Sequence, residues 1–336
     1  MDVRVLVIGS YNHDLVWELD ALPAPGETRR ALGFRQGPGG KGMNQAVAAA
    51  RQGVATAFIG ACGADAFAAD LRALAAAEGI EARLQTVPEA ATGSAAILVD
   101  AAGRNSIAVA LGANDRLSAA HVEAQAELLT QARVVLAPLE SPPAAVARAF
   151  ALGRAAGAIT LLNPAPVHPE LDAGLLDLAD LLTPNETEFA QLLERFAGVR
   201  VDAAALASLD DESLAALCAR LPCSTLVLTL GAAGVFAAAG GRAAAHAPKR
   251  LQQPCRLAVP EVTVIDTTGA GDAFNGALAA AWASAPDHPL TSVLPWAVAV
   301  ASLSTERTGA ALAVPRRAET EARFGQRFPA ASWPLG

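Results

Sequence analysis

Residues 266–276 read Asp266-Thr267-Thr268-Gly269-Ala270-Gly271-Asp272-Ala273-Phe274-Asn275-Gly276. The β-like run Val262–Ile265 precedes this stretch, and an Ala-rich segment follows it. This order predicts a strand, a glycine-rich turn and a helix, which is the repeating unit of an α/β protein. The first N–H groups of such a helix point outward and the helix dipole favours negative charge there, so the turn is a candidate anion site.

Asp272 lies inside this candidate anion site, where its negative charge is unfavourable beside a bound phosphate. A carboxylate placed there is better explained as a general base than as a group that serves the fold. The alternative is an Asp that caps the start of the helix, which is a common arrangement. The residue pattern leaves both interpretations open.

The rest of the chain repeats the alternation of short β-rich runs with longer helical stretches. The predicted strands are Val3–Ile8, Thr56–Ile59, Arg133–Leu136, Ala158–Leu162, Leu181–Leu182 and Thr225–Leu230. The predicted helices are Gly42–Gln52, Asp65–Glu78, Ala119–Gln131, Pro143–Ala156, Glu186–Phe196 and Glu212–Leu221. Continuous apolar strands suit a parallel sheet buried on both faces. The sequence therefore predicts a doubly wound α/β core.

Two regions break this alternation and read as β-hairpins. One pairs Leu15–Asp20 with Arg29–Gln36, and the other pairs Ala95–Asp100 with Ser106–Leu111. They predict a small β-sheet lid from about 14–37 and 94–111. No linker, charge block or repeat divides the chain, so we expect one domain over 1–336. The irregular stretch 240–264 predicts a further hairpin with a long loop.

Composition excludes several classes of function. The 33 acidic residues outnumber the 25 basic ones and give a formal net charge of −8, which argues against nucleic acid as the main partner. No apolar run reaches the roughly 18 residues of a membrane span, and the N-terminus lacks the features of a signal peptide. The four cysteines are scattered in no metal-binding pattern. We expect reduced thiols in a cytoplasmic protein without a membrane partner.

Two further polar or glycine-rich segments follow predicted β-structure. Gly37–Asn44 matches the glycine spacing of a dinucleotide-binding loop, but that loop directly follows the first strand and this one does not. We therefore interpret it as backbone that lets a small polar ligand approach closely. Asn12 and Asp14, after the first strand, face the same way in extended chain and suit vicinal hydroxyls, although an Asx-turn fits them equally well.

Three weaker signals lie at the carboxyl ends of other predicted strands. Glu140 follows the strand-like run 134–139, and Thr229–Gly234 leads from a strand into a glycine turn. In Thr183-Pro184-Asn185-Glu186 either the threonine or the asparagine could simply cap the next helix.

Taken together, these segments resemble the ribokinase branch of the PfkB family of sugar kinases, in the same order and over nearly the whole chain. Gly39–Ala46 and Asp266–Gly276 are similar to the two signatures of the family. The segments typical of the ribokinase branch are Gly112-Ala113-Asn114, Leu139-Glu140-Ser141, Asn163-Pro164-Ala165-Pro166 and Thr183-Pro184-Asn185-Glu186. The resemblance implies a three-layer α/β/α core with a mostly parallel central sheet and a small β-sheet lid.

The resemblance also assigns an activity, ATP-dependent phosphorylation of D-ribose at the 5-hydroxyl. It implies that Asp272 is the base and that the amides of Gly269, Ala270 and Gly271 form the anion hole. The residues that would hold the sugar are Asn12, Asp14, Gly39, Gly40, Lys41, Asn44 and Glu140, together with Asp272.

The cofactors implied are ATP, Mg²⁺ and K⁺. ATP would contact Asn185, Gly271 and the segment Thr229, Leu230, Gly231, Ala232, Ala233 and Gly234. Glu188 would hold Mg²⁺ through water. The K⁺ neighbourhood would be Asp266, Thr268, Ser304, Arg307, Gly309 and Ala313, and Ala313 stands where many relatives carry a hydroxyl. Exposed lid strands are prone to pairing, and family members commonly form lid dimers, so we expect a homodimer.

Two other functions stay open at this point. The first is a kinase for 2-deoxyribose, another pentose or a nucleoside, because the sequence does not reveal the shape of the pocket. The second is a non-catalytic sugar-binding protein on the same fold, although Asp272 and its glycine turn argue against it.

Overall fold

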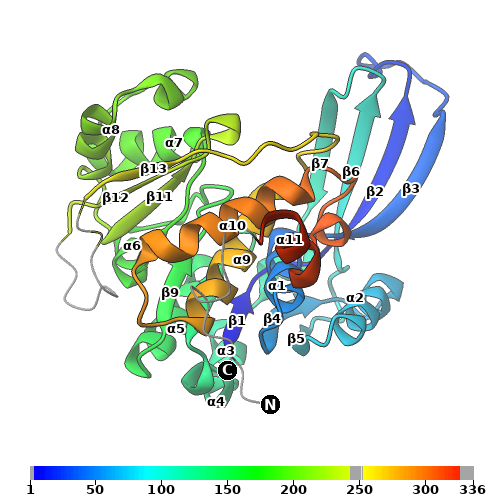
Figure 1. Cartoon of the computed structure of the whole chain (residues 1–336). Helices are drawn as coiled ribbons and strands as arrows, with labels where there is room; N and C mark the ends of the chain where they lie inside the picture. The colour runs from blue at the N-terminus through cyan, green and yellow to red at the C-terminus, as the bar shows by residue number, and fades with distance from the viewer. Residues whose placement is uncertain (1–3, 243–250, 252, 326–336) are drawn as a thin grey trace.

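The predicted alternation builds one large sheet in a computed structural model that describes residues 4–242, 251 and 253–325 (Figure 1). Its nine strands lie in the order β13-β12-β11-β10-β9-β8-β1-β4-β5. Their bounds are β1 Val5–Ile8, β4 Thr56–Cys62, β5 Glu81–Thr86, β8 Val134–Ala137, β9 Ile159–Leu162, β10 Leu181–Leu182, β11 Thr225–Thr229, β12 Val235–Ala239 and β13 Cys255–Leu257. Neighbours from β11 to β5 are parallel, whereas β12 and β13 pair antiparallel.

Helices cover both faces of this sheet, because its strands are apolar on both sides. In β1, Val5 and Val7 pack on one face and Leu6 and Ile8 on the other. The first face carries α1 Lys41–Arg51, α2 Ala66–Ala77, α9 Ala270–Ser284 and α10 Leu290–Ser304. The second carries α3 Ala119–Glu123, α4 Ala126–Gln131, α5 Pro143–Ala155, α6 Ala173–Leu178, α7 Glu186–Ala197 and α8 Asp211–Cys218. The expected three-layer α/β/α core is confirmed.

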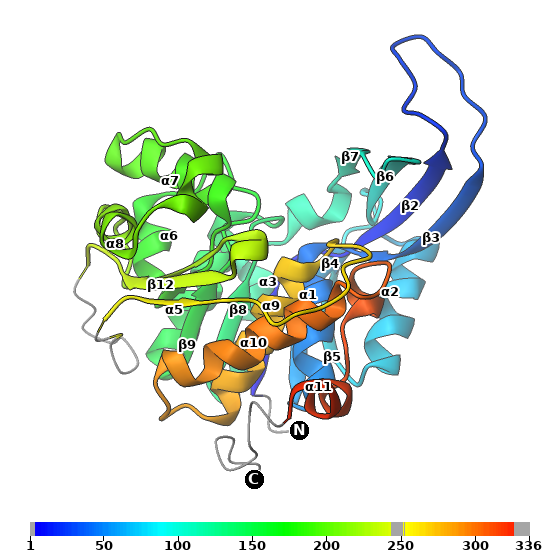
Figure 2. The ribbon, with the colours of Figure 1, turned by 45° about the horizontal axis from the view of Figure 1, so that its top comes forward.

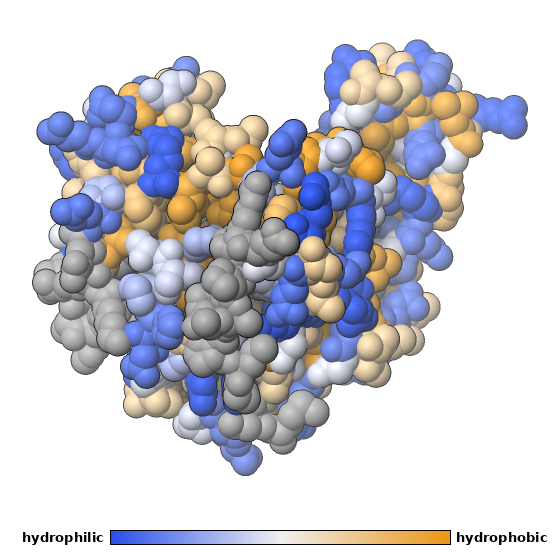
Figure 3. All heavy atoms as spheres, in the orientation of Figure 1, coloured by the Kyte–Doolittle hydropathy of each residue, from blue (hydrophilic) through white to orange (hydrophobic). Residues whose placement is uncertain are grey.

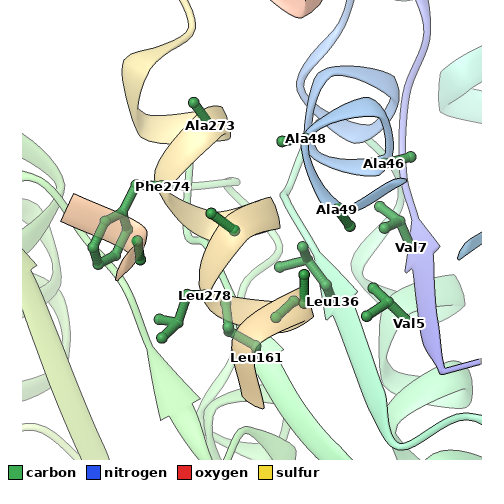
Figure 4. Close-up of a cluster of buried hydrophobic side chains, with 14 of the residues drawn as sticks. Val5, Val7, Ala46, Ala48, Ala49, Leu136, Leu161, Ala273, Phe274 and Leu278 are labelled. Carbon is green, nitrogen blue, oxygen red and sulfur yellow. The ribbon is translucent and has the colours of Figure 1, made fainter. Parts of the chain in front are cut away.

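The first helical layer is built largely from small side chains. A Cβ on Gly276 of α9 would lie 2.3 Å from the carbonyl oxygen of Gln45 in α1, so the two helices are in close contact there. Figure 4 shows Ala49 of α1 next to Val7, and Leu278 of α9 next to Leu161, within the same buried cluster. Small residues let the two helices approach the strands and each other, as the turned view shows (Figure 2). The start of α9, which carries Asp272, is therefore fixed directly against the start of α1.

A second, smaller sheet stands apart from the core as the lid (Figure 1). Its strands are β2 Asn12–Leu19, β3 Gly33–Gly39, β6 Gly93–Asp100 and β7 Asn105–Ala110, in the order β3-β2-β6-β7. Both predicted hairpins are confirmed as antiparallel pairs, and β2 joins them by pairing parallel with β6. The lid also reaches further toward the core than predicted, since β2 begins at Asn12 and β3 ends at Gly39.

Some local predictions were wrong. Val262–Ile265 is not a strand: its last residue donates to the carbonyl of Thr305 at the end of α10 rather than to a strand. The predicted helix Ala119–Gln131 is divided into α3 and α4, because Gln125 leaves helical backbone angles. Helix α8 ends at Cys218, three residues before the predicted end at Leu221.

The remaining differences concern elements that the sequence did not reveal. Strand β5, helices α6 and α10, and α11 Arg317–Phe324, whose Phe324 packs on α10, were not predicted. The hairpin expected within 240–264 was placed wrongly. Its second strand, β13, lies in this stretch, but β12, with which it pairs antiparallel, ends before it at Ala239. Residues 243–250 and 252 of the loop between them lie outside the described residues. None of the described helices has both the length and the apolarity to cross a lipid bilayer.

Candidate active site

The predicted site residues come together at one edge of the main sheet, beneath the lid. The loops after β1, β8, β9, β10 and β11 all leave the sheet at this edge, because carboxyl ends of parallel strands share one side. Figure 3 shows a deep notch in the surface between the lid and the lobe that carries α7 and α8. The site is divided between these two walls, with the start of α9 below them.

The lid wall begins with Asn12 and Asp14, which lie on the same face of β2. Asn12 is buried and its Oδ1 accepts from Nδ2 of Asn114 at 3.0 Å. Asn114 also bonds both backbone groups of Tyr11, accepting at 3.1 Å and donating at 2.9 Å. Asn114 thereby fixes the strand from which Asp14 projects. It was not predicted as a site residue, although it lies in one of the segments typical of the family branch.

Two glycines explain why the strands of the lid can meet so closely at the base. A Cβ on Gly39 would lie 2.2–2.3 Å from the carboxylate atoms of Asp14. Gly40 has a φ of +83°, and a Cβ there would lie 2.5 Å from the amide nitrogen of Asn12. Both positions therefore require glycine, the first for space and the second for backbone conformation as well. These glycines let β3 pack closely against β2, whereas the close approach of a small polar ligand to the same backbone stays a prediction.

Glu140 joins two segments at the bottom of this pocket by hydrogen bonds. Its Oε2 accepts from Oγ of Ser10 at 2.6 Å and from the backbone N–H of Lys41 at 2.8 Å. The Ser10 hydroxyl accepts in turn from the N–H of Gly42 at 3.3 Å. One carboxylate thus joins the loop after β1 to the start of α1. Ser10 was missed in the sequence, because nothing local distinguishes it from an ordinary loop serine.

Asp272 lies at the start of α9 and is buried against α1. Its two carboxylate oxygens accept from Nδ2 of Asn44 and from Nε2 of Gln45, each at 2.9 Å. Burial raises the pKa of Asp272 above its ordinary value, while the charge of Lys41 and the two amide donors act in the opposite direction. The carboxylate is thus desolvated yet held by donors, as a general base with a defined orientation requires.

The glycine turn before Asp272 has the predicted helix-start geometry. Gly269 caps α9 with a left-handed φ of +74°, and Ala270 is the first helical residue. The first amides of a helix have no acceptor within that helix, and a Cβ on Gly271 would meet open space. The N–H of Ala270 donates to the carbonyl of Thr267 at 3.2 Å, so a ligand that uses this amide has to replace that bond.

The opposite wall brings Asn185 next to Thr229. The two residues form a parallel bridge, and the N–H of Thr229 donates to the carbonyl of Pro184 at 3.0 Å. Asn185 also caps α7, since it accepts from the N–H of Glu188 at 2.9 Å while the Glu188 carboxylate accepts from the N–H of Asn185 at 2.9 Å. The capping interpretation is therefore correct, and it does not exclude a ligand contact at the same loop. The turn after Thr229 closes by a bond from the N–H of Leu230 to the carbonyl of Gly234.

Glu188 is the carboxylate of this wall whose charge interacts with that of Asp272. Burial raises its pKa, the bond from Asn185 and the charge of Lys41 lower it, and the charge of Asp272 raises it. The charge of Lys41 therefore lowers the pKa of both Glu188 and Asp272.

Asp266 fastens the turn to the segment after α10. One carboxylate oxygen accepts from the N–H of Thr268 and the other from the N–H of Gly309, each at 2.9 Å. Although burial alone would raise it, these bonds hold the pKa of Asp266 below its ordinary value. Arg307 is committed to an ion pair with Glu319.

The other residues predicted around Asp266 offer few side-chain oxygens. Ser304 donates its hydroxyl to the carbonyl of Ala301 at 2.8 Å, and Ala313 is buried without a polar side chain. Of the six residues predicted there, only Asp266, Thr268 and Ser304 therefore carry a side-chain oxygen. Arg307, Gly309 and Ala313 could contribute backbone carbonyls alone.

Comparison with known proteins places these residues in a family. The model of the pfkB family carbohydrate kinases matches residues 3–317. A ribokinase of Haemophilus influenzae is 35% identical over 325 residues, covering 95% of this chain and 98% of its own. A deoxyribokinase of Salmonella typhi is 34% identical over 281 residues, covering 82% and 84%.

The fold agrees with this sequence similarity. The solved structure of Arabidopsis thaliana ribokinase, complexed with ribose and ATP, superposes with a TM-score of 0.78 at 28% identity and covers 96% of this chain and 98% of its own. The match of the family model over nearly the whole chain, together with these relatives, shows that the chain belongs to the PfkB family of carbohydrate kinases.

Proposed function

We propose that this carbohydrate kinase transfers the γ-phosphoryl group of ATP to the 5-hydroxyl of D-ribose. The observation that carries the proposal is Asp272, a buried carboxylate held by Asn44 and Gln45 at the helix start that follows the glycine turn. The relative from Haemophilus influenzae and the Arabidopsis structure with ribose and ATP support ribose and ATP as the two substrates.

The sugar would lie under the base of the lid. Asn12, Asp14, Lys41, Asn44 and Glu140 supply polar side chains there, while Gly39 and Gly40 supply backbone. The Oδ1 of Asn44 is buried and has no hydrogen-bond partner among the described residues. A buried acceptor without a donor costs free energy, so a sugar hydroxyl that donates to it would be bound favourably.

The chemistry needs few groups. Asp272 takes the proton of the sugar 5-hydroxyl while the oxygen of that hydroxyl forms a bond to the γ-phosphorus of ATP. The bond between this phosphorus and the β–γ bridging oxygen breaks, and ADP is released. The amides of Gly269, Ala270 and Gly271 face the negative charge of the transferred group. Positioning and charge stabilisation of this kind account for most of the catalysis in phosphoryl transfer.

ATP would lie against the opposite wall. Its contacts would be Asn185, Gly271 and the segment Thr229, Leu230, Gly231, Ala232, Ala233 and Gly234. Glu188 fits Mg²⁺ held through water, because it is a carboxylate beside the phosphate turn and hard oxygens suit that ion. Mg²⁺ would neutralise charge on the phosphates.

K⁺ would bind beside the turn, near Asp266, Thr268, Ser304, Arg307, Gly309 and Ala313. The carboxylate of Asp266, the hydroxyl of Thr268 and backbone carbonyls suit a hard monovalent cation, and the guanidinium of Arg307 is paired with Glu319. Because Ala313 has no hydroxyl and both Asp266 oxygens already accept N–H bonds, we expect the ion to be held weakly.

The substrate alternative is 2-deoxyribose, which the similarity to the Salmonella deoxyribokinase favours. An ADP-release assay across ribose, 2-deoxyribose, fructose, adenosine and cytidine separates these choices. Turnover with ribose above all others is the expected result. No turnover with any acceptor would favour a sugar-binding protein instead.

The role of Asp272 is tested by Asp272→Asn. We expect kcat to fall by roughly 10²–10⁴, the usual contribution of a positioned base, while ribose binding measured by calorimetry stays near that of the wild type. The matched control is Asp180→Asn, at a buried aspartate that directly precedes β10, outside the site. Turnover like that of the wild type in Asp272→Asn would remove this residue from the mechanism.

Two properties complete the proposal. A homodimer would form through the lid, whose exposed apolar side chains include Phe34, Ile107 and Val109. A cytoplasmic location fits the four cysteines, which are all free thiols, as is usual in a reducing compartment.

A further inference from the structure

A chain of buried polar side chains runs from the carboxylate of Asp272 into the interior. It starts at Gln45, whose Nε2 donates to Oδ1 of Asp272 at 2.9 Å and to Oδ1 of Asn163 at 3.0 Å. Both hydrogens of this amide are therefore used. Asn163 continues the chain by donating from Nδ2 to the carbonyl of Thr183 at 2.9 Å.

The chain then returns to the helix that carries Asp272. The hydroxyl of Thr183 donates to Oδ1 of Asn275 at 2.6 Å, and Nδ2 of Asn275 donates to the carbonyl of Gly271 at 2.8 Å. Gly271 is the last residue of the glycine turn. The path thus connects the base to the turn through α1, the loops after β9 and β10, and the first turn of α9.

These four side chains lie where the core is otherwise apolar. Their exposed fractions are 0% for Gln45, 6% for Asn163, 1% for Thr183 and 1% for Asn275. A buried pair of hydrogen-bonded polar groups contributes only modest net stability, and replacing both partners by apolar groups of the same shape can be nearly neutral or stabilising. Stability alone therefore gives no reason for a polar path at this place.

We propose that Gln45, Asn163, Thr183 and Asn275 form a positioning network that holds the Asp272 carboxylate and the glycine turn in one fixed relation. This inference rests on the proposed function, because it assigns the network to the same transfer step. Phosphoryl transfer is sensitive to such an arrangement, since displacing a reacting group by about 1 Å can cost roughly a hundredfold in rate.

The network also acts on the charge of the base. The charged groups that influence Asp272 or are influenced by it are Lys41, Glu140, Asp14 and Glu188. Of these, Lys41 favours the ionised carboxylate and the three acids oppose it. The hydrogen bond from Gln45 lowers the pKa of Asp272. Without this donor, the pKa of Asp272 should rise further.

The first test compares two buried threonines of adjacent strands. Thr183→Val removes the hydroxyl that bonds Asn275, whereas Thr160→Val removes one that bonds Asp180 and the carbonyl of Leu178, away from the site. For Thr183→Val we expect kcat to fall roughly tenfold with both KM values nearly unchanged, because the reacting groups are displaced while the substrates still bind. Thr183→Ser should restore kcat, and Thr160→Val should lower only the melting temperature.

The second test compares two buried glutamines, Gln45 within α1 and Gln52 directly after the end of α1. Gln45→Met should move the acid limb of the kcat–pH profile to higher pH, because Asp272 loses a donor. Gln52→Met should leave the profile unchanged, since Gln52 bonds Pro315 and Trp296 instead.

The outcomes separate this inference from the proposed function. Equal loss of kcat in the two threonine variants, no loss in either, or no shift of the profile for Gln45→Met would overturn the positioning network while the wild type remains a kinase. Absence of turnover in the wild type with every sugar would instead overturn the proposed function, and with it the role assigned to the network.

Discussion

Asp14, which we propose as a sugar ligand, carries a carboxylate whose ionisation is opposed by burial. Burial, followed by the charge of Glu140, raises its pKa from 3.8 to about 6, although Arg35 opposes this shift. The carboxylate is therefore still ionised at neutral pH, where it can accept hydrogen bonds from two sugar hydroxyls. We expect the KM for ribose, but not for ATP, to rise as pH falls through about 6, because the protonated form accepts less well.

Asp14→Asn checks this expectation for binding and for stability. Its ribose KM should be high and independent of pH between about 5 and 8. A pKa that is raised on folding makes stability fall as pH rises from 3.8 through about 6. The variant, which cannot ionise, should therefore melt higher than the wild type at neutral pH and equally near pH 4. Asp20→Asn, on the exposed end of the same hairpin, should leave the ribose KM unchanged. It should not raise the melting temperature at neutral pH, because bonds from Ala21 and Arg29 lower the pKa of Asp20. A wild-type KM that is flat across pH 6 would contradict the assignment.

At the scale of elements, the start of α9 is held by a segment that follows α10. Asp266 joins them by accepting from Thr268 and Gly309, and the extended stretch before it bonds Thr305. A cation bound here would strengthen this junction and so order the turn. We expect potassium to raise kcat at constant Mg²⁺ and ionic strength, sodium to do so less, and the half-saturating concentration to be high.

The measurement is a rate titration in which KCl replaces a bulky organic cation. Ala313→Ser should lower the half-saturating concentration, because it adds a hydroxyl oxygen where the chain has none. A melting temperature that rises with potassium in the absence of substrates would be the independent sign of binding. Full activity without potassium would mean that Asp266 serves the local fold alone.

At the scale of the whole molecule, the lid is a sheet with little of its own core. Every residue of β7 is exposed, and the lid face that looks toward the body shows Ile107 at 52% and Val109 at 49%. Figure 3 shows hydrophobic surface on the lid among hydrophilic residues. An apolar sheet face of this kind is stabilised by a partner, and a second lid offers the same chemistry. We expect a dimer in sedimentation experiments.

Ile107→Glu should convert this dimer to monomer, because a buried charge at the contact would be unpaired. Ser106→Glu is the matched control, since it lies next in the same strand on the opposite face and is equally exposed. Dissociation by both variants, or by neither, would place the contact away from this face of the lid.

The sequence alone determined the class of fold, and it indicated the residues of the candidate site apart from Ser10 and Asn114. Strand–helix alternation and apolar runs are local properties, so six of the nine strands of the mostly parallel main sheet and most of the helices between them follow from these patterns, and the hairpins of the lid follow from turns and alternation. The turns at Gly40 and Gly269 could be recognised from their glycines, and the structure shows that both residues have a positive φ, which favours glycine.

Tertiary structure decided the contacts between segments far apart in the chain. Gln45 and Asp272 are separated by 227 residues, and nothing near either residue specifies that their side chains meet. Whether Val262–Ile265 becomes a strand likewise depended on its neighbour, which is the end of a helix and not another strand. A hydrogen bond needs its partner within about 3 Å, and that distance is fixed only when the apolar layers have packed. For this reason Asp272, the proposed base, and the glycine turn before it could be picked out from the sequence. The buried polar path that joins them appears only in the folded molecule.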